Sequence, residues 1–204
     1  MFRATDVVRH LLIINVLMYF GTRVLGENVV NTLAIYFPTS EHFQPYQIVT
    51  HMFMHGNLMH LFFNMFAVYM FGSPVEAFWG ARRFLFFYLF SGFGALGLHL
   101  LVQYWEMQSG SLPPQFVDVP MLGASGAVFG LLVAYGMLFP NSIIQMIFPP
   151  IAMKAKYFVI LYAGLELFFG LQSLMPGVAH FAHLGGALFG FLLILYWRKF
   201  SRFR

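Results

Sequence analysis

The chain has 204 residues, of which 60% are hydrophobic and only 9% are charged. Soluble globular domains carry roughly 25% charged residues, so the composition excludes a soluble or disordered protein and predicts a chain surrounded by lipid. The absence of cysteine excludes disulfides, a thiolate nucleophile and metal binding through cysteine.

Six apolar stretches follow one another along the chain, each about as long as a membrane-spanning helix needs to be. They cover approximately Val7–Leu25, Asn57–Gly80, Phe84–Trp105, Pro120–Phe139, Tyr157–Leu174 and Val178–Trp197. The backbone must satisfy its own hydrogen bonds in lipid, and the stretches lack the alternation of a barrel, so we predict helices. We expect an all-α membrane protein in which residues 1–204 form a single six-helix domain.

The basic residues predict the orientation of these helices. If the N-terminus lies inside, ten of the 11 Lys and Arg residues fall on the inner side, and only Arg23 falls near the outer side. Basic residues accumulate in cytoplasmic loops. We therefore expect both ends of the chain in the cytoplasm, an arrangement that an odd number of spans would break.

Two connections between the predicted spans are long, and a third is interrupted by prolines. Residues 26–56 form an outer loop rich in Phe, Tyr, Met and His, which we expect to lie partly in the membrane interface with short helical pieces. Within it, His51 and His55 are either metal ligands or structural hydrogen-bonding residues, and we favour the structural role. Residues 106–119 form a second outer loop, and prolines interrupt the inner connection 140–155.

Four polar side chains fall within the second, fourth and sixth spans, where lipid disfavours them. With a rise of 1.5 Å per residue, Ser125 and His183 lie roughly 8 Å below the outer boundary, His60 about 5 Å and Asn64 about 10 Å. His60 and Asn64 are four residues apart and share a helix face. A hydroxyl, an imidazole and two further donors at one depth are what acyl-transfer chemistry requires.

Glycines accompany these residues at helical spacing. Gly126 and Gly130 follow Ser125 on the fourth span, and Gly186 and Gly190 follow His183 on the sixth. Small residues four apart allow helix backbones to approach closely. That approach is necessary for a Ser–His hydrogen bond of about 2.6–3.2 Å.

These residues form three motifs that resemble those of rhomboid intramembrane serine proteases. The motifs GxSG, HxxxN and AHxxGxxxG are matched in turn by Gly123-Ala-Ser125-Gly126, His60-Leu-Phe-Phe-Asn64 and Ala182-His183-Leu-Gly-Gly186-Ala-Leu-Phe-Gly190. Each motif lies on the span where the family has it. The resemblance covers roughly residues 7–197.

The resemblance implies a serine endopeptidase of the bacterial inner membrane that cleaves single-span membrane proteins near the outer end of their transmembrane segment. Ser125 would be the nucleophile and His183 the general base, in a dyad without an acidic third member. The backbone N–H of Ser125 and the side chains of His60 and Asn64 would bind the oxyanion. Transmembrane substrates and the lipid bilayer are the expected partners, with no nucleic acid, metal or cofactor.

The sequence departs from the family pattern at several positions. Tyr46-Gln47 stands where the family often has Trp-Arg, and His180 stands where a small or amide residue is common. Phe129 takes the place of an aromatic residue, often Tyr, that packs beneath the histidine. Two acids lie in or beside the spans: we expect a neutral or hydrogen-bonded structural role for Glu166, and Glu76 to secure the inner end of the second span.

Two other readings stay open. A rhomboid-like protein could bind membrane clients without cleaving them, but such proteins typically lack the serine or the histidine. A membrane protein that binds a metal or haem through histidines would leave the GxSG motif unexplained.

Overall fold

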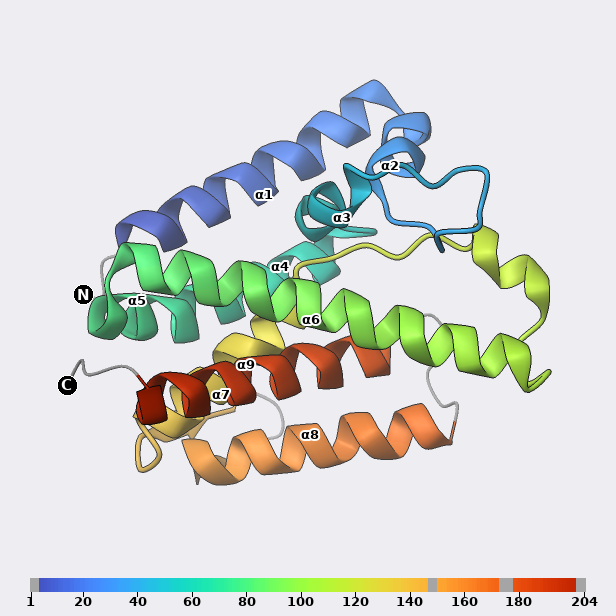
Figure 1. Cartoon of the computed structure of the whole chain (residues 1–204). Coiled ribbons are helices and arrows are strands. Elements are labelled where there is room, and N and C mark those ends of the chain that lie inside the picture. Colours follow the sequence, from blue (N-terminus) through green and yellow to red (C-terminus); the bar gives the residue numbers. More distant parts are fainter. Residues whose placement is uncertain (1–3, 147–149, 173–177, 201–204) are drawn as a thin grey trace.

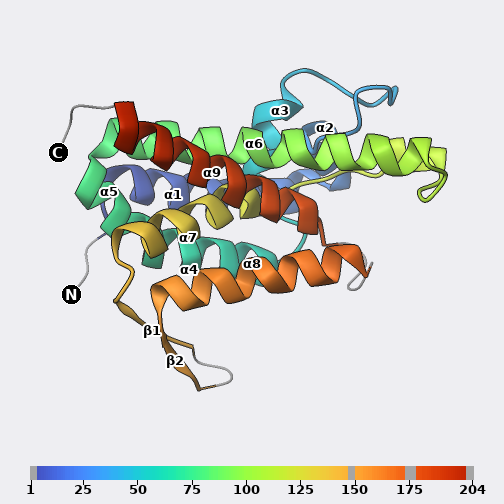
Figure 2. The same ribbon diagram turned by 60° about the horizontal axis from the view of Figure 1, so that its bottom comes forward.

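The computed structural model describes residues 4–146, 150–172 and 178–200, and these form a bundle of helices with one short hairpin (Figures 1 and 2). The α-helices are α1 (Asp6–Leu25), α2 (Glu27–Leu33), α3 (Gln47–Thr50), α4 (Leu58–Ala67), α5 (Ser73–Trp79), α6 (Ala81–Gln108), α7 (Ser125–Leu138), α8 (Ala155–Leu171) and α9 (His180–Phe200). The shorter elements are η1 (His51–Phe53), η2 (Val68–Gly72), η3 (Pro114–Asp118), β1 (Ile143–Gln145) and β2 (Ala152–Lys154).

The six predicted spans correspond to α1, the continuous helix from α4 to α5, α6, α7, α8 and α9. Within the described residues, four helices are long and apolar enough to cross a membrane, namely α1, Leu58–Trp79, α6 and α9. The apolar helix α7 is shorter, with 14 residues, and α8 has 17 residues. Many large apolar side chains of α1, α8 and α9 are exposed, as expected for surfaces that contact lipid. The chain is a multi-pass integral membrane protein with an all-α bundle.

The predicted start of the fourth helix was wrong. The helix begins at Ser125 and not near Pro120, because the preceding residues are extended and paired with another segment. Met121 and Ile35 exchange two backbone hydrogen bonds of 2.8 and 2.9 Å. Ser125 is therefore the first residue of its helix and does not lie one turn inside it.

The long loop 26–56 contains the short helices that the sequence predicts, and it packs against the segment that leads into α7. Gln47, at the position where the family often has Arg, is 1% exposed. Its Nε2 donates to the carbonyl oxygens of Thr32 and His42, and its Oε1 accepts from the backbone N–H of Gln44. The Gln47 side chain therefore connects the segments around Thr32 and around His42–Gln44 to the helix α3.

The helix α7 lies in the middle of the bundle, in contact with α4, α5, α6, α8 and α9 (Figure 2). Its glycines face other backbones closely. A Cβ on Gly186 would overlap the carbonyl oxygen of Gly126, and a Cβ on Gly190 would lie 3.1 Å from the Cα of Gly130. The α7–α9 contact is therefore one of backbone against backbone.

The second span contains one π-helical stretch, η2, between α4 and α5. Pro74 follows it at the start of α5 and has no N–H to offer the preceding turn. A local change of helical pitch is a common response to such a residue.

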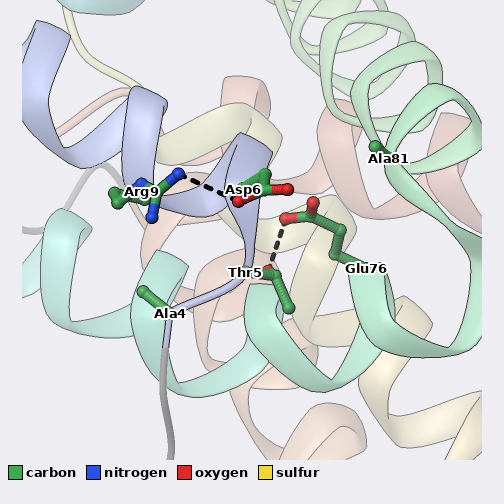
Figure 3. A pocket seen from close by; sticks show the side chains of 6 residues that line it. All are labelled: Ala4, Thr5, Asp6, Arg9, Glu76 and Ala81. Carbon is green, nitrogen blue, oxygen red and sulfur yellow. Dashed lines mark hydrogen bonds and ion pairs between the residues drawn. The ribbon is translucent and has the colours of Figure 1, made fainter.

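Glu76 in α5 binds the start of α1 (Figure 3). Its carboxylate accepts hydrogen bonds from the hydroxyl of Thr5 and from the backbone N–H groups of Val7 and Val8. A carboxylate at a helix N-terminus satisfies N–H groups that have no partner inside the helix. Glu76 therefore secures this end of the second span by joining it to α1.

The same region contains a cavity of about 570 Å³ lined by Ala4, Thr5, Asp6, Arg9, Glu76 and Ala81 (Figure 3). It lies near the end of the second span opposite to His60, because Glu76 and His60 are 16 residues apart on one continuous helix. The cavity is therefore remote from the polar residues that the motifs bring together.

Candidate active site

Ser125 and His183 come from two adjacent helices and meet directly. Nε2 of His183 lies 2.8 Å from Oγ of Ser125. Ser125 starts α7, and His183 lies one turn into α9, which crosses α7 at the glycine contact. Both side chains are partly buried. A hydroxyl at hydrogen-bonding distance from an imidazole is the pair from which nucleophilic catalysis starts.

The ring of Phe129 supports the imidazole of His183. The two rings are stacked with centroids 4.4 Å apart and planes 8° apart. Phe129 is four residues after Ser125, so it lies on the same face of α7 one turn further along. The stack restricts tilting of the imidazole and leaves its edge directed at Ser125.

The turn before α7 brings a second histidine to Ser125. Gly123 has a φ of 130°, a conformation that residues with a Cβ rarely adopt. A Cβ there would lie 2.8 Å from Cε1 of His60, so the imidazole packs directly against the glycine backbone. The N–H of Gly123 donates to the carbonyl of His51, which fixes the turn from the other side.

Asn64 lies one turn after His60 and is buried. Its Nδ2 donates to the carbonyl oxygen of His60 at 2.8 Å, which uses one of the two amide hydrogens. Among the described contacts, no hydrogen bond joins Asn64 or His60 to Ser125. The structure therefore brings the His60 ring beside the Ser–His pair and puts Asn64 on the adjoining turn.

Glu166 of α8, which the motifs did not associate with the site, lies beside His183, although the resemblance implied a dyad without an acidic third member. Its Oε2 lies 2.6 Å from Nδ1 of His180 and 3.0 Å from Nδ1 of His183. The three side chains are 14%, 7% and 13% exposed, in the same order. The signal in the sequence was an acid inside an apolar span, but nothing in the chain indicates which helix it faces.

Glu166, His180 and His183 could offer one oxygen and two nitrogen ligands to a metal. Two ligand atoms on a tetrahedral zinc lie roughly 3.4 Å apart, given bond lengths of about 2.1 Å. The observed separations of 2.6 and 3.0 Å are shorter. They fit direct contacts between the carboxylate and the two rings.

His51 and His55 are both buried in the loop that precedes α4. Nδ1 of His51 lies 2.7 Å from the carbonyl oxygen of Gln47. The ring of His55 packs against that of His60 with centroids 5.0 Å apart. Burial lowers the pKa of each to about 4, so both rings are neutral at pH 7. The contact of His51 fits the structural role that we favoured.

The family model of the Rhomboid domain matches residues 42–200, which include all of the site residues described above. The chain belongs to the rhomboid family. The match begins within the long loop and ends at the last residue of α9.

This rhomboid is similar to several curated relatives. It is 32% identical to Rhomboid protease AarA of Providencia stuartii, over 70% of this chain and 52% of the relative. It is 31% identical to Rhomboid-like protein 11, chloroplastic, of Arabidopsis thaliana, over 93% of this chain and 65% of the relative. It is 27% identical to Rhomboid-like protease 3 of Toxoplasma gondii, over 81% of this chain and 57% of the relative. The chain therefore spans between about half and two thirds of the length of these relatives.

Proposed function

We propose that this rhomboid is an intramembrane serine endopeptidase that cleaves single-span membrane proteins near the outer end of their transmembrane segment. The observation that supports it best is the 2.8 Å contact between Ser125 Oγ and His183 Nε2, beside a ring stack that holds the imidazole. The names of two relatives, which are called proteases, agree with this activity.

The proposed reaction uses the Ser–His pair in two steps. His183 accepts the Ser125 proton at Nε2 while Oγ attacks the peptide carbonyl, and it then gives that proton to the leaving amine. Water subsequently hydrolyses the acyl-enzyme, with His183 again acting as the base. The cycle consumes one water molecule and leaves both side chains as they began.

The oxyanion of each step would form beside the first turn of α7. The N–H of Ser125 lies at the start of the helix, where backbone donors have no partner inside the helix. We assign the two side-chain donors to His60, whose ring packs on Gly123, and to Asn64. Removing one such donor from a soluble protease reduces kcat by about 100-fold to 1,000-fold.

We further propose that the protein lies in a bacterial inner membrane with both termini in the cytoplasm, as its basic residues predict. Ser125 then lies toward the outer side, from which water reaches it. A substrate helix must unwind there because a helical backbone hides its carbonyl groups. Helix-breaking residues near the outer end of a span are therefore the expected preference.

A fluorophosphonate probe on purified protein in detergent tests this function. We expect covalent labelling of the wild-type protein, and none of Ser125→Ala. Reconstituted in liposomes with a panel of single-span substrates, the wild type should cleave and Ser125→Ala and His183→Ala should not. Folded wild-type protein that is neither labelled nor active would favour a rhomboid that binds membrane clients without cleaving them.

A further inference from the structure

Glu166 lies at the edge of the His183 ring opposite to Ser125. Nε2 of His183 contacts Ser125, and Nδ1 lies 3.0 Å from the Glu166 carboxylate. Both views show α8, which carries Glu166, beside α9, which carries His183 (Figures 1 and 2). The three side chains thus form a continuous row of hydroxyl, imidazole and carboxylate.

The proton positions in this row follow from the contacts of one oxygen. Oε2 of Glu166 lies close to Nδ1 of both His180 and His183, and an oxygen carries at most one proton, so it cannot donate to both rings. An ionised carboxylate only accepts, in which case both rings carry hydrogen on Nδ1. His183 then has its lone pair on Nε2, the atom that faces the Ser125 hydroxyl and must accept its proton.

We propose that Glu166 is a positioning residue that acts through His183, a role that rests on the function proposed above. It holds the tautomer with hydrogen on Nδ1, and it stabilises the imidazolium that forms when the proton of Ser125 passes to Nε2. Glu166 keeps its negative charge and takes no proton. Because it attracts an imidazolium more than a neutral ring, the contact stabilises the transition state more than the ground state.

His180 orients the Glu166 carboxylate toward His183. It is the first residue of α9, three before His183, so both rings lie on one face of that helix. Its Nδ1 approaches the same oxygen at 2.6 Å. Because His180 already restrains the carboxylate, Glu166 loses little further conformational entropy when the imidazolium of His183 forms.

The contact between Glu166 and His183 is close but not well aligned. The Nδ1 atom makes no hydrogen bond of good geometry, although the oxygen lies at 3.0 Å. Catalytic hydrogen bonds are often loose without substrate and tighten in the transition state. The parallel face of Phe129 leaves the imidazole free to rotate within its own plane.

Two substitutions separate the charge of Glu166 from its size. Glu166→Gln keeps the size and removes the charge, whereas Glu166→Asp keeps the charge and shortens the side chain by one methylene. Glu106→Gln, which removes an acid near the end of α6, is the matched control. The measurements are the rate of fluorophosphonate labelling at Ser125, and kcat and KM for a single-span substrate in liposomes.

We expect Glu166→Gln to lower the labelling rate and kcat by about 10-fold or more, with KM nearly unchanged, by analogy with the loss of an orienting acid from a triad. Glu166→Asp should recover part of both rates, and Glu106→Gln should match the wild type. A Glu166→Gln protein that labels as fast as the wild type overturns the proposal. Equal losses of labelling rate and kcat in Glu166→Gln and Glu166→Asp also overturn the proposal. So does wild-type activity that EDTA removes and zinc restores.

A measurement on the unmutated protein covers the case in which Glu166→Gln fails to fold. In nitrogen-15 NMR of histidine-labelled wild type at neutral pH, we expect hydrogen on Nδ1 of His183 and none on Nε2. The His183 signals are identified by their loss in His183→Gln. Hydrogen on Nε2 overturns the proposal. If the wild-type protein is neither labelled by the probe nor able to cleave substrate, both the proposed protease activity and the positioning role are contradicted. If the wild type is labelled and Glu166→Gln is labelled at the same rate, the positioning role alone is contradicted.

Discussion

Gly186 of α9 lies so close to Gly126 of α7 that a Cβ on Gly186 would overlap the carbonyl oxygen of Gly126. Ser125 immediately precedes Gly126, and His183 lies three residues before Gly186. The separation of the two reactive side chains therefore depends on a contact between backbones. Side-chain rearrangement cannot relieve a clash with backbone, so one added methyl group must move a helix.

We expect Gly186→Ala to reduce both stability and activity. Overpacking typically reduces stability by 1–3 kcal/mol, and we expect a loss of about 3 kcal/mol here because the obstructing atom is backbone. A shift of roughly 1 Å between reacting groups can lower the rate by about 100-fold. Thermal unfolding in detergent and substrate cleavage measure the two effects.

Gly97→Ala in α6 is the control for this substitution. A Cβ at Gly97 meets nothing within 4 Å, and alanine favours a helix more than glycine does. This variant should keep its activity and unfold at the wild-type temperature or slightly above it. If Gly186→Ala behaves in the same way, the glycine contact does not hold Ser125 and His183 together.

A second prediction concerns the carboxylate that joins α5 to α1. Glu76→Ala removes the acceptor of two backbone N–H groups and leaves them without a partner. Hydrogen bonds to charged groups contribute about 1.5–3 kcal/mol each, so we expect a loss of at least about 2 kcal/mol of stability. Glu76→Gln keeps one acceptor oxygen and should lose less. Equal unfolding temperatures for wild type and Glu76→Ala would show that α1 does not need this contact.

Stability should also fall in mild acid because of the loop histidines. Burial lowers the pKa of His51 and of His55 from 6.5 to about 4. The unfolded chain binds protons below pH 6.5 that the folded chain does not bind until pH 4, so stability decreases as the pH falls through this range. Each histidine accounts for about 3 kcal/mol at pH 4.

Thermal unfolding from pH 7.5 to pH 4 tests the role of these histidines. His55→Leu removes one of the two groups, and its unfolding temperature should depend less steeply on pH than that of the wild type. His10→Leu is a suitable control, because His10 is exposed on α1. A His55→Leu protein with the full wild-type dependence would show that His55 is not buried in its neutral form.

The helices and the meeting of Ser125 with His183 were predictable because their signals are local. Apolar stretches revealed the spans, and the motifs around Ser125 and His183 identified candidates without any knowledge of the fold. The early start predicted for α7 has a physical reason. The residues before Ser125 are as apolar as the helix itself, but backbone hydrogen bonds to Ile35 and His51, which are distant in sequence, hold them outside the helix.

The contacts of the two acids could not be predicted in the same way. Glu166 meets His183 because α8 packs beside α9, and composition does not determine how two apolar helices face each other. Glu76 was expected to secure the end of its own span, but its sequence neighbours do not indicate that it does so by binding the start of α1, 68 to 71 residues away. Glu76 is buried and binds an element far away in sequence, whereas Glu166 is partly buried and binds the helix that follows its own.

The final prediction concerns the two side chains assigned to the oxyanion. Donors directed at charge that appears only in the transition state affect kcat and leave KM nearly unchanged. We expect Asn64→Ala to lower kcat by about 10-fold or more. His60→Ala should lower it further, because the His60 ring also fills the space beside Gly123.

Steady-state kinetics on a single-span substrate in liposomes distinguishes this role from substrate binding. Asn57→Ala is the control on the same helix: Asn57 caps α4 through the backbone N–H of His60 and is exposed, so its loss should affect stability and leave kcat nearly unchanged. A raised KM with unchanged kcat in both His60→Ala and Asn64→Ala would place the pair in substrate binding. The N–H of Ser125 would then be the remaining donor for the oxyanion, and the rate would depend on the first turn of α7 alone.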